Sequence, residues 1–234
     1  MCGRYTLFTP AEELASRFDA TFEEPAEPRY NCAPGQSLPV LTNDDPDRFR
    51  RFKWGLIPSW ADDEGVGNDL INARAETLAE KPSFEAAYER RRCLVPADGF
   101  YEWVQEGDAK QPYRVAFADD RPFAMAGLWE RWEPSHTQTG LGDFGGGSGS
   151  ESDGDDAVES FTIVTTEPND VVADLHHRMA VVLDPDEEAT WLHGDVEEAA
   201  ELLDPSPGDE WEAYPVSTRV NSPANDAPAL IEPV

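Results

Sequence analysis

The central β-strand signal in this chain reads Cys93-Leu94-Val95-Pro96-Ala97-Asp98-Gly99-Phe100-Tyr101-Glu102-Trp103-Val104. Apolar side chains stand on both sides of Asp98-Gly99, and a glycine inside a strand pattern marks a bend. We therefore expect one strand with a kink at Asp98-Gly99. Glu102 lies among aromatic residues, which would raise the pKa of its carboxyl group and suit it to acid–base chemistry. On an exposed edge strand it would have no such role.

Short secondary-structure signals continue on both sides of this stretch. Runs rich in apolar and aromatic residues predict strands at 29–36, 38–42, 52–58, 71–76, 113–117, 123–129, 161–166, 181–183 and 214–217. Short helices are expected near 9–18, 83–92, 169–175, 185–192 and 196–203. Strands dominate, so the predicted fold class is α+β, with a curved, barrel-like, mainly antiparallel β core and short peripheral helices.

Three local patterns make more specific predictions. Thr9-Pro10-Ala11-Glu12 predicts a helix with Thr9 as N-cap, proline at the first position and Glu12 in a capping box. The runs 113–117 and 123–129 predict a hairpin around residues 118–122. Residues 71–76 alternate, so Asn72, Arg74 and Glu76 should project from one face of a strand. Three polar side chains on one face predict a functional site.

A tract with few apolar residues interrupts the pattern at 133–159. It contains Gly145-Gly146-Gly147-Ser148-Gly149-Ser150 among acidic residues, and strand-like sequence resumes directly after it. We therefore expect a disordered acidic loop insertion within one domain that spans residues 2–234. The chain shows neither an apolar run of membrane-spanning length nor a secretory signal, which predicts a cytoplasmic protein.

The charge is strongly negative, with 48 acidic and 18 basic residues and a formal net charge of −30. Such a potential repels nucleic acid, yet a hydrated acidic surface is also typical of cytosolic proteins from halophiles, so the charge indicates habitat more than partner. Cys2, Cys32 and Cys93 are far apart and lack metal-ligand spacing. They predict reduced thiols, with no disulfide framework, no metal site and no bound cofactor.

The amino terminus carries a second chemical signal, in Cys2-Gly3-Arg4-Tyr5. Removal of Met1 would leave a thiol two carbons from a free α-amine, a combination that an internal cysteine lacks. An α-amine of pKa about 7.7–8.0 and a thiol of about 8.5 both supply some reactive form near neutrality. Together they can trap an aldehyde as an imine and then close a five-membered thiazolidine. In a frayed terminus Cys2 would instead be incidental.

Several motifs in order resemble the SRAP family (SOS response-associated peptidases, the abasic-site processing proteins). The resemblance runs nearly end to end, and only the acidic insertion lacks a counterpart. It is carried by Met1-Cys2-Gly3-Arg4-Tyr5, Arg29-Tyr30-Asn31 with Ala33-Pro34-Gly35-Gln36, Trp54-Gly55-Leu56-Ile57-Pro58-Ser59-Trp60, Asn72-Ala73-Arg74-Ala75-Glu76, the stretch Arg92 to Trp103, His176-His177-Arg178-Met179 and Val220-Asn221-Ser222-Pro223.

The resemblance implies covalent capture of the ring-opened aldehyde of an abasic site in single-stranded DNA. Cys2 would be the nucleophile, Asn72 would orient its amine or the sugar, Glu102 would transfer protons and His176 would assist opening of the sugar ring. It also implies a DNA interface: Arg74 and Arg178 resemble phosphate-binding arginines, with Arg4 as a third, while Pro34 and Trp60 resemble surfaces on which bases stack. The protein would act as a monomer, without a nucleotide cofactor or a membrane, and would associate with the nucleoid when bound to DNA.

Two other functions remain open from the sequence. The protein could be a cysteine peptidase in which His176 activates Cys2, with autocatalytic removal of Met1 as one reaction. It could also bind single strands non-covalently through arginine and aromatic side chains alone. A lyase-like reaction belongs to the covalent alternative and a hydrolase reaction to the peptidase alternative.

Overall fold

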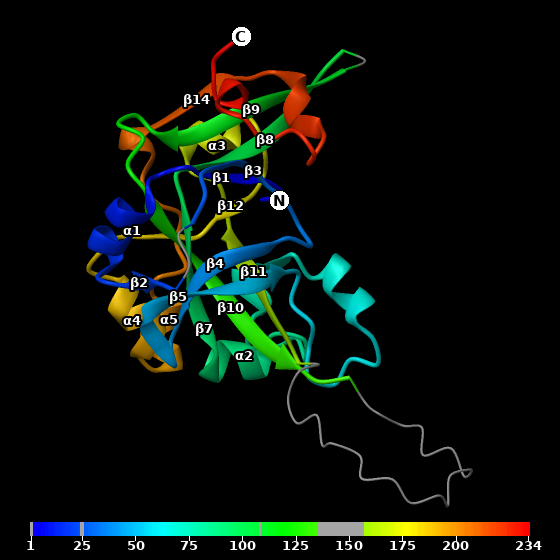
Figure 1. Ribbon diagram of the computed structural model, residues 1–234, viewed down its shortest axis with the longest axis vertical. Coiled ribbons are helices and arrows are strands. Elements are labelled where there is room, and N and C mark those ends of the chain that lie inside the picture. Colours follow the sequence, from blue (N-terminus) through cyan, green and yellow to red (C-terminus); the bar gives the residue numbers. More distant parts are fainter. Residues whose placement is uncertain (1, 24–25, 108, 135–156) are drawn as a thin grey trace, which may run out of the picture.

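The computed structural model describes residues 2–23, 26–107, 109–134 and 157–234, and five of the strands in these ranges form a closed ring (Figure 1). Strand β11 pairs with β10, β10 with β7, β7 with β4, β4 with β5, and β5 again with β11. Closure gives every strand of the ring two neighbours and so removes the open edges of the sheet. The ring consists of β11 (Val158–Thr166), β10 (Phe123–Trp132), β7 (Arg92–Ala97), β4 (Ser37–Thr42) and β5 (Asp45–Trp54).

Short strands extend the ring, and a second sheet lies at one end of it, at the top of Figure 1. The extensions are β2 (Thr21–Phe22), β6 (Asn72–Arg74), β12 (Met179–Ala180) and β13 (Val182–Leu183). The second sheet runs in the order β14 (Trp211–Pro215), β9 (Ala109–Phe117), β8 (Gly99–Glu106), β1 (Tyr5–Leu7) and β3 (Arg29–Cys32).

The helices are short and lie outside the strands. The α-helices are α1 (Ala11–Phe18), α2 (Glu85–Arg90), α3 (Asp170–Ala173), α4 (Glu188–His193) and α5 (Val196–Ala200). The 3-10 helices are η1 (Glu64–Asp69), η2 (Ala75–Thr77), η3 (Gly208–Glu210), η4 (Thr218–Asn221) and η5 (Pro228–Leu230). Among the described strands, only the pairs β11–β5, β11–β6 and β2–β5 are parallel. The predicted α+β class, with a barrel-like and mainly antiparallel core, is therefore confirmed.

The kink at Asp98-Gly99 is confirmed and joins the two sheets. Residues 92–97 form β7 in the ring, whereas residues 99–106 form β8 in the second sheet. Asp98 between them is fully buried, and its carboxylate accepts hydrogen bonds from Phe8 N, Thr9 N and Thr9 Oγ1. A Cβ atom at Gly99 would come within 2.9 Å of Val115 O and 3.0 Å of Arg114 Nε. The turn therefore needs glycine because the neighbouring strand passes so close.

The predicted hairpin of residues 113–117 and 123–129 is wrong. Strand β9 pairs with β8 and β14 in the second sheet, whereas β10 pairs with β7 and β11 in the ring. The connection between them therefore crosses from one sheet to the other. Asp120 in this connection has φ 56°, and it accepts a hydrogen bond from the buried Arg114 at 2.7 Å. The pairing partners available in each sheet override the local turn signal.

The start of α1 and the strand at 71–76 also differ from the predictions. Pro10 is the N-cap of α1, and no side chain caps the helix because the Thr9 hydroxyl bonds to Asp98 instead. Strand β6 ends at Arg74, and Glu76 lies in η2, so these residues do not share one strand face.

The domain assignment stays a prediction. Trp132 of β10 pairs with Val158 of β11, so the last two residues of the predicted 133–159 insertion belong to a strand, while residues 135–156 lie outside the described ranges. No helix in the described part of the chain is long and apolar enough to cross a membrane.

Candidate active site

The predicted catalytic residues converge from four parts of the chain on the junction between the ring and the second sheet. Cys2 lies three residues before the start of β1, and Glu102 lies on β8 of the same sheet. Asn72 opens β6, and His176 lies between α3 and β12. Both β6 and β12 pair with the end of β11, where Thr165 opposes Arg74 on one side and Ala180 on the other. Strand β11 thus brings together segments that are about 100 residues apart in sequence.

Cys2 is fully buried and is held by its backbone and its thiol. Asn72 Nδ2 donates to Cys2 O at 3.0 Å, which fixes the peptide group next to the predicted nucleophile. The Cys2 Sγ lies 4.0 Å from Arg4 O. Burial, and then the charge of Glu102, raise the pKa of the Cys2 thiol to about 12. The thiol is therefore protonated at neutral pH and needs a proton acceptor to react.

Glu102 has the properties of that proton acceptor. The residue is 3% exposed, and burial raises the pKa of its carboxyl group to about 7. A carboxyl group with this pKa can both take and give a proton near neutrality. Glu102 Oε1 lies 3.9 Å from Nδ1 of His176.

His176 is held by the backbone two residues later. Arg178 N donates to Nδ1 at 3.1 Å, and Arg178 O lies 3.0 Å from the same atom. Burial lowers the pKa of His176, so the neutral imidazole predominates at neutral pH. The structure therefore brings all four predicted catalytic residues into one region, in which Asn72 bonds to Cys2, the charge of Glu102 acts on the Cys2 thiol, and His176 lies beside Glu102.

The three arginines predicted to bind phosphate differ in accessibility. Arg74 is exposed. Arg4 is partly buried, and its Nη1 donates to Asn31 Oδ1 at 3.2 Å and to Val220 O at 2.9 Å. Arg178 is 7% exposed and forms a bidentate ion pair with Glu76. Phosphate binding stays a prediction for all three, and Arg74 is the arginine that solvent reaches most readily.

The two predicted stacking residues are both at the surface. Trp60 is 58% exposed, and its Nε1 donates to Pro82 O at 3.4 Å. An exposed tryptophan of this size is unusual, because large aromatic side chains are usually buried. Pro34 is half-buried in the turn before β4.

Asn31, for which the sequence predicts no role, has a structural role near the site. Asn31 is fully buried, and its Nδ2 contacts the carbonyl oxygens of Val220, Ser222 and Asn225 at 2.8–3.2 Å. With its bond to Arg4, it ties the amino-terminal strand to the carboxy-terminal segment. Its only sequence signal was its place in the motif Arg29-Tyr30-Asn31.

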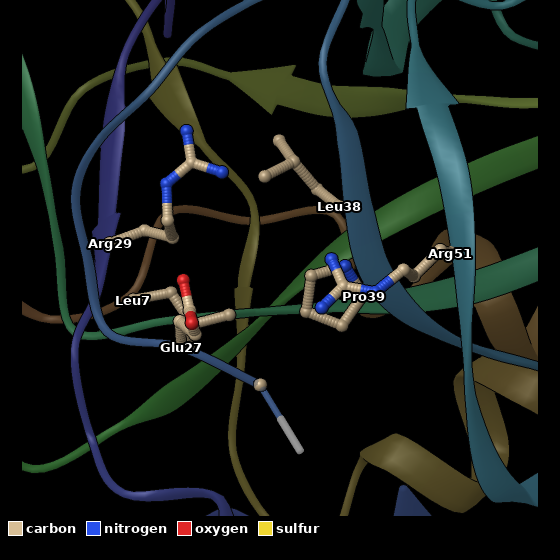
Figure 2. A pocket seen from close by; sticks show the side chains of 7 residues that line it. Leu7, Glu27, Arg29, Leu38, Pro39 and Arg51 are labelled. Carbon is tan, nitrogen blue, oxygen red and sulfur yellow. The ribbon is translucent and has the colours of Figure 1, made fainter. Parts of the chain in front are cut away.

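A separate pocket lies at the other end of β1 (Figure 2). Its volume is about 280 Å³, and Leu7, Ala26, Glu27, Arg29, Leu38, Pro39 and Arg51 line it. None of these is a predicted site residue, and Arg29 is already paired with Asp226 at 2.5 Å. Within the described ranges, no three His, Cys, Asp or Glu side chains are grouped as metal ligands.

Comparisons with known proteins agree on one family. Residues 1–223 match the profile described as SOS response associated peptidase (SRAP). Abasic site processing protein YoqW of Bacillus subtilis is 40% identical, over 99% of each chain, and YedK of Escherichia coli is 32% identical over the full length of both. A crystal structure of a protein from Bacteroides thetaiotaomicron superposes with a TM-score of 0.83 at 28% identity, over 100% of each chain. The chain therefore belongs to the SRAP family.

Proposed function

We propose that this chain processes abasic sites in DNA by capturing their ring-opened aldehyde covalently at Cys2. The observation that carries the proposal is the position of Glu102, a buried carboxyl group of pKa about 7 whose charge acts on the Cys2 thiol and which lies 3.9 Å from His176. Relatives that match at 40% and 32% identity are named abasic site processing proteins.

The reaction needs the α-amine of Cys2 to be free, so Met1 must be removed first. The amine adds to the aldehyde carbon, and loss of one water gives an imine. The Cys2 sulfur then adds to the same carbon while the thiol proton passes to a base and a proton reaches the nitrogen. The product is a thiazolidine, and the net change is aldehyde plus aminothiol to thiazolidine plus water.

The side chains of the site support these steps. Glu102 takes the proton of a thiol that is too weakly acidic to ionise at neutral pH, and returns a proton to the leaving hydroxyl or the nitrogen. The Asn72 bond to Cys2 O holds the nucleophile in place. His176, neutral and 3.9 Å from Glu102, assists opening of the closed sugar.

The proposed DNA partner is a single strand, bound by a monomer of this protein. Arg74 is exposed next to Asn72 and would contact phosphate, with Arg4 and Arg178 as further contacts. Exposed Trp60 and the half-buried Pro34 would stack on bases. Unpaired bases are required for stacking of this kind, which favours single-stranded over duplex DNA.

A cysteine peptidase is the competing function, and the Cys2 environment argues against it. Peptidases of this type use a thiolate, which is formed when neighbouring positive charge lowers the pKa of the cysteine. Burial and the Glu102 charge act in the opposite direction on Cys2.

The test is mass spectrometry and a denaturing gel on a single-stranded oligonucleotide that carries one abasic site. Wild type should give a heat-stable adduct, whereas Cys2→Ser should give at most an imine that borohydride can trap. An amino-terminally extended form should give no adduct although its thiol is intact. The control is Cys93→Ala, which removes another fully buried thiol and should leave the adduct unchanged. Full adduct from the extended form would disprove the mechanism, because a plain thiol nucleophile tolerates a blocked amine.

A further inference from the structure

The Arg178 side chain has a fixed position below the protein surface. Nη1 and Nη2 donate to the two carboxylate oxygens of Glu76 at 2.6 and 3.0 Å, and Nε donates to Thr165 Oγ1 at 3.2 Å. Nη2 also donates to Thr165 O. A guanidinium group has five N–H donors, so these four bonds leave one for any other partner. Most of the hydrogen-bonding capacity of Arg178 is therefore used inside the protein.

The backbone of the same residue determines where the imidazole of His176 lies. Arg178 N and Arg178 O lie 3.1 and 3.0 Å from His176 Nδ1. A neutral Nδ1 accepts from the amide in one tautomer and donates to the carbonyl oxygen in the other, so in either tautomer the ring is bonded to the backbone of Arg178. Arg178 is 7% exposed and directly precedes β12, so both its side chain and its peptide group are packed inside the protein. Anything that fixes the Arg178 guanidinium therefore also fixes the His176 ring.

Glu76 connects the segment that carries Asn72 to the segment that carries His176, through its ion pair with Arg178. It lies in η2, directly after the strand β6 that carries Asn72 and Arg74, and its ion pair spans 102 positions of sequence. The hydrogen bond from Arg178 lowers the pKa of Glu76, so the carboxylate is ionised at neutral pH. Glu76 therefore carries the negative charge that the ion pair with Arg178 needs at neutral pH.

We propose that Glu76 is a positioning residue for aldehyde capture: its carboxylate fixes Arg178, whose backbone in turn holds the imidazole of His176 beside Glu102. This inference rests on the proposed function and adds a residue to it. Without Glu76 the guanidinium keeps only its Thr165 bonds, and the peptide group that contacts His176 can shift. Misplacement of a reacting group by about 1 Å costs up to about 100-fold in rate.

A second ion pair in the protein provides a matched control. Arg17 donates to both carboxylate oxygens of Glu188, at 2.6 and 3.2 Å, so this pair is bidentate like Arg178–Glu76. It joins α1 to α4, and neither residue contacts a predicted site residue in any hydrogen bond or ion pair of the described chain. Glu188→Gln therefore breaks an equivalent ion pair away from the site.

The first experiment measures single-turnover adduct formation by wild type, Glu76→Gln and Glu188→Gln over a range of oligonucleotide concentrations. For Glu76→Gln we expect the rate constant at saturating DNA to fall by about 10- to 100-fold. The final amplitude should stay full, since a folding defect would lower the amplitude and not the rate constant. Glu188→Gln should match wild type.

Three results would overturn the inference. An unchanged rate constant would mean that His176 does not depend on Glu76. A faster reaction would mean that Glu76 competes with DNA phosphate for Arg178. A change only in the half-saturating DNA concentration would assign Glu76 to binding.

A second experiment needs no DNA and separates this inference from the proposed function. Hydrogen exchange of the Arg178 amide, followed by NMR, reports directly on the bond to His176 Nδ1. Exchange should become at least about tenfold faster in Glu76→Gln and stay unchanged in Glu188→Gln. Equal exchange in all three proteins would overturn the role of Glu76. If wild type formed no adduct, the proposed function would fail and the exchange measurement would still decide the role of Glu76.

Discussion

Asp98 and Glu102 are buried carboxyl groups on the same kinked stretch of chain, but their partners differ. Asp98 accepts hydrogen bonds from two backbone N–H groups and from the Thr9 hydroxyl. Glu102 lies among titratable side chains, near the Cys2 thiol and the His176 imidazole. Burial raises the pKa of both groups, so a raised pKa does not distinguish them. The difference teaches that a carboxyl group bound by fixed donors supports the fold, whereas one that faces titratable partners can move protons.

The comparison predicts its largest effect for Glu102→Gln. Removing the proton acceptor should slow adduct formation by about 10²–10⁴-fold, the usual contribution of general acid–base catalysis. The melting temperature should be no lower than that of wild type, since glutamine has almost the same shape and no charge to bury. The measurement is the single-turnover rate constant together with a thermal melt. A rate constant within about threefold of wild type would remove Glu102 from the mechanism.

Asp98→Ala should show the opposite pattern. The substitution leaves Phe8 N, Thr9 N and the Thr9 hydroxyl without their partner inside the protein, which should lower the free energy of unfolding by about 4 kcal/mol. The rate constant of the molecules that stay folded should equal that of wild type. Urea denaturation measures the loss, and Asp98→Asn, which keeps one acceptor oxygen, should lie between the two proteins. A normal stability combined with a lost rate would reverse the roles assigned to the two carboxyl groups.

The smallest of these effects is a dependence of stability on pH. The pKa of Glu102 rises from 4.5 to about 7 on folding, so the folded state disfavours the ionised carboxylate. Below about pH 4.5 Glu102 is protonated in both the folded and the unfolded state, so the free energy of unfolding of wild type has its highest value relative to Glu102→Gln. As the pH rises to about 7, the free energy of unfolding of wild type falls relative to that variant, by about 3 kcal/mol in total. Urea denaturation of both proteins between pH 4 and about 8 measures it. A constant difference would show that Glu102 titrates normally.

Sequence patterns were sufficient for the features that depend on neighbouring residues. The kink at Asp98-Gly99 follows from a glycine and a polar residue inside an apolar run, and the same run indicated that Glu102 is enclosed by aromatic side chains. Both features are local, and the structure confirms the kink and shows that Glu102 is buried. The positions of Cys2, Asn72 and His176 in one region were implied by family resemblance and not by any pattern within the chain.

Features that depend on distant partners could not be predicted in this way. The sequence around Thr9 is typical of a helix N-cap, but the Thr9 hydroxyl donates its hydrogen bond to Asp98, which is 89 positions away. Strands β9 and β10 are joined by a short connection typical of a hairpin, yet each finds its partners in a different sheet. The ion pair between Arg178 and Glu76 spans 102 positions, so no local pattern could show that most of the arginine's donors are used inside the protein.

The pairing of β10 with β11 has a practical consequence for studying this protein. Trp132, the last residue of β10, pairs with Val158, the first residue of β11, and the Trp132 indole donates to Ala61 O at 2.8 Å. Figure 1 places this end of the ring away from the second sheet, where Cys2 lies. A fluorophore or surface tether attached at this end of the ring would allow capture of single DNA molecules to be timed while the amino terminus stays free.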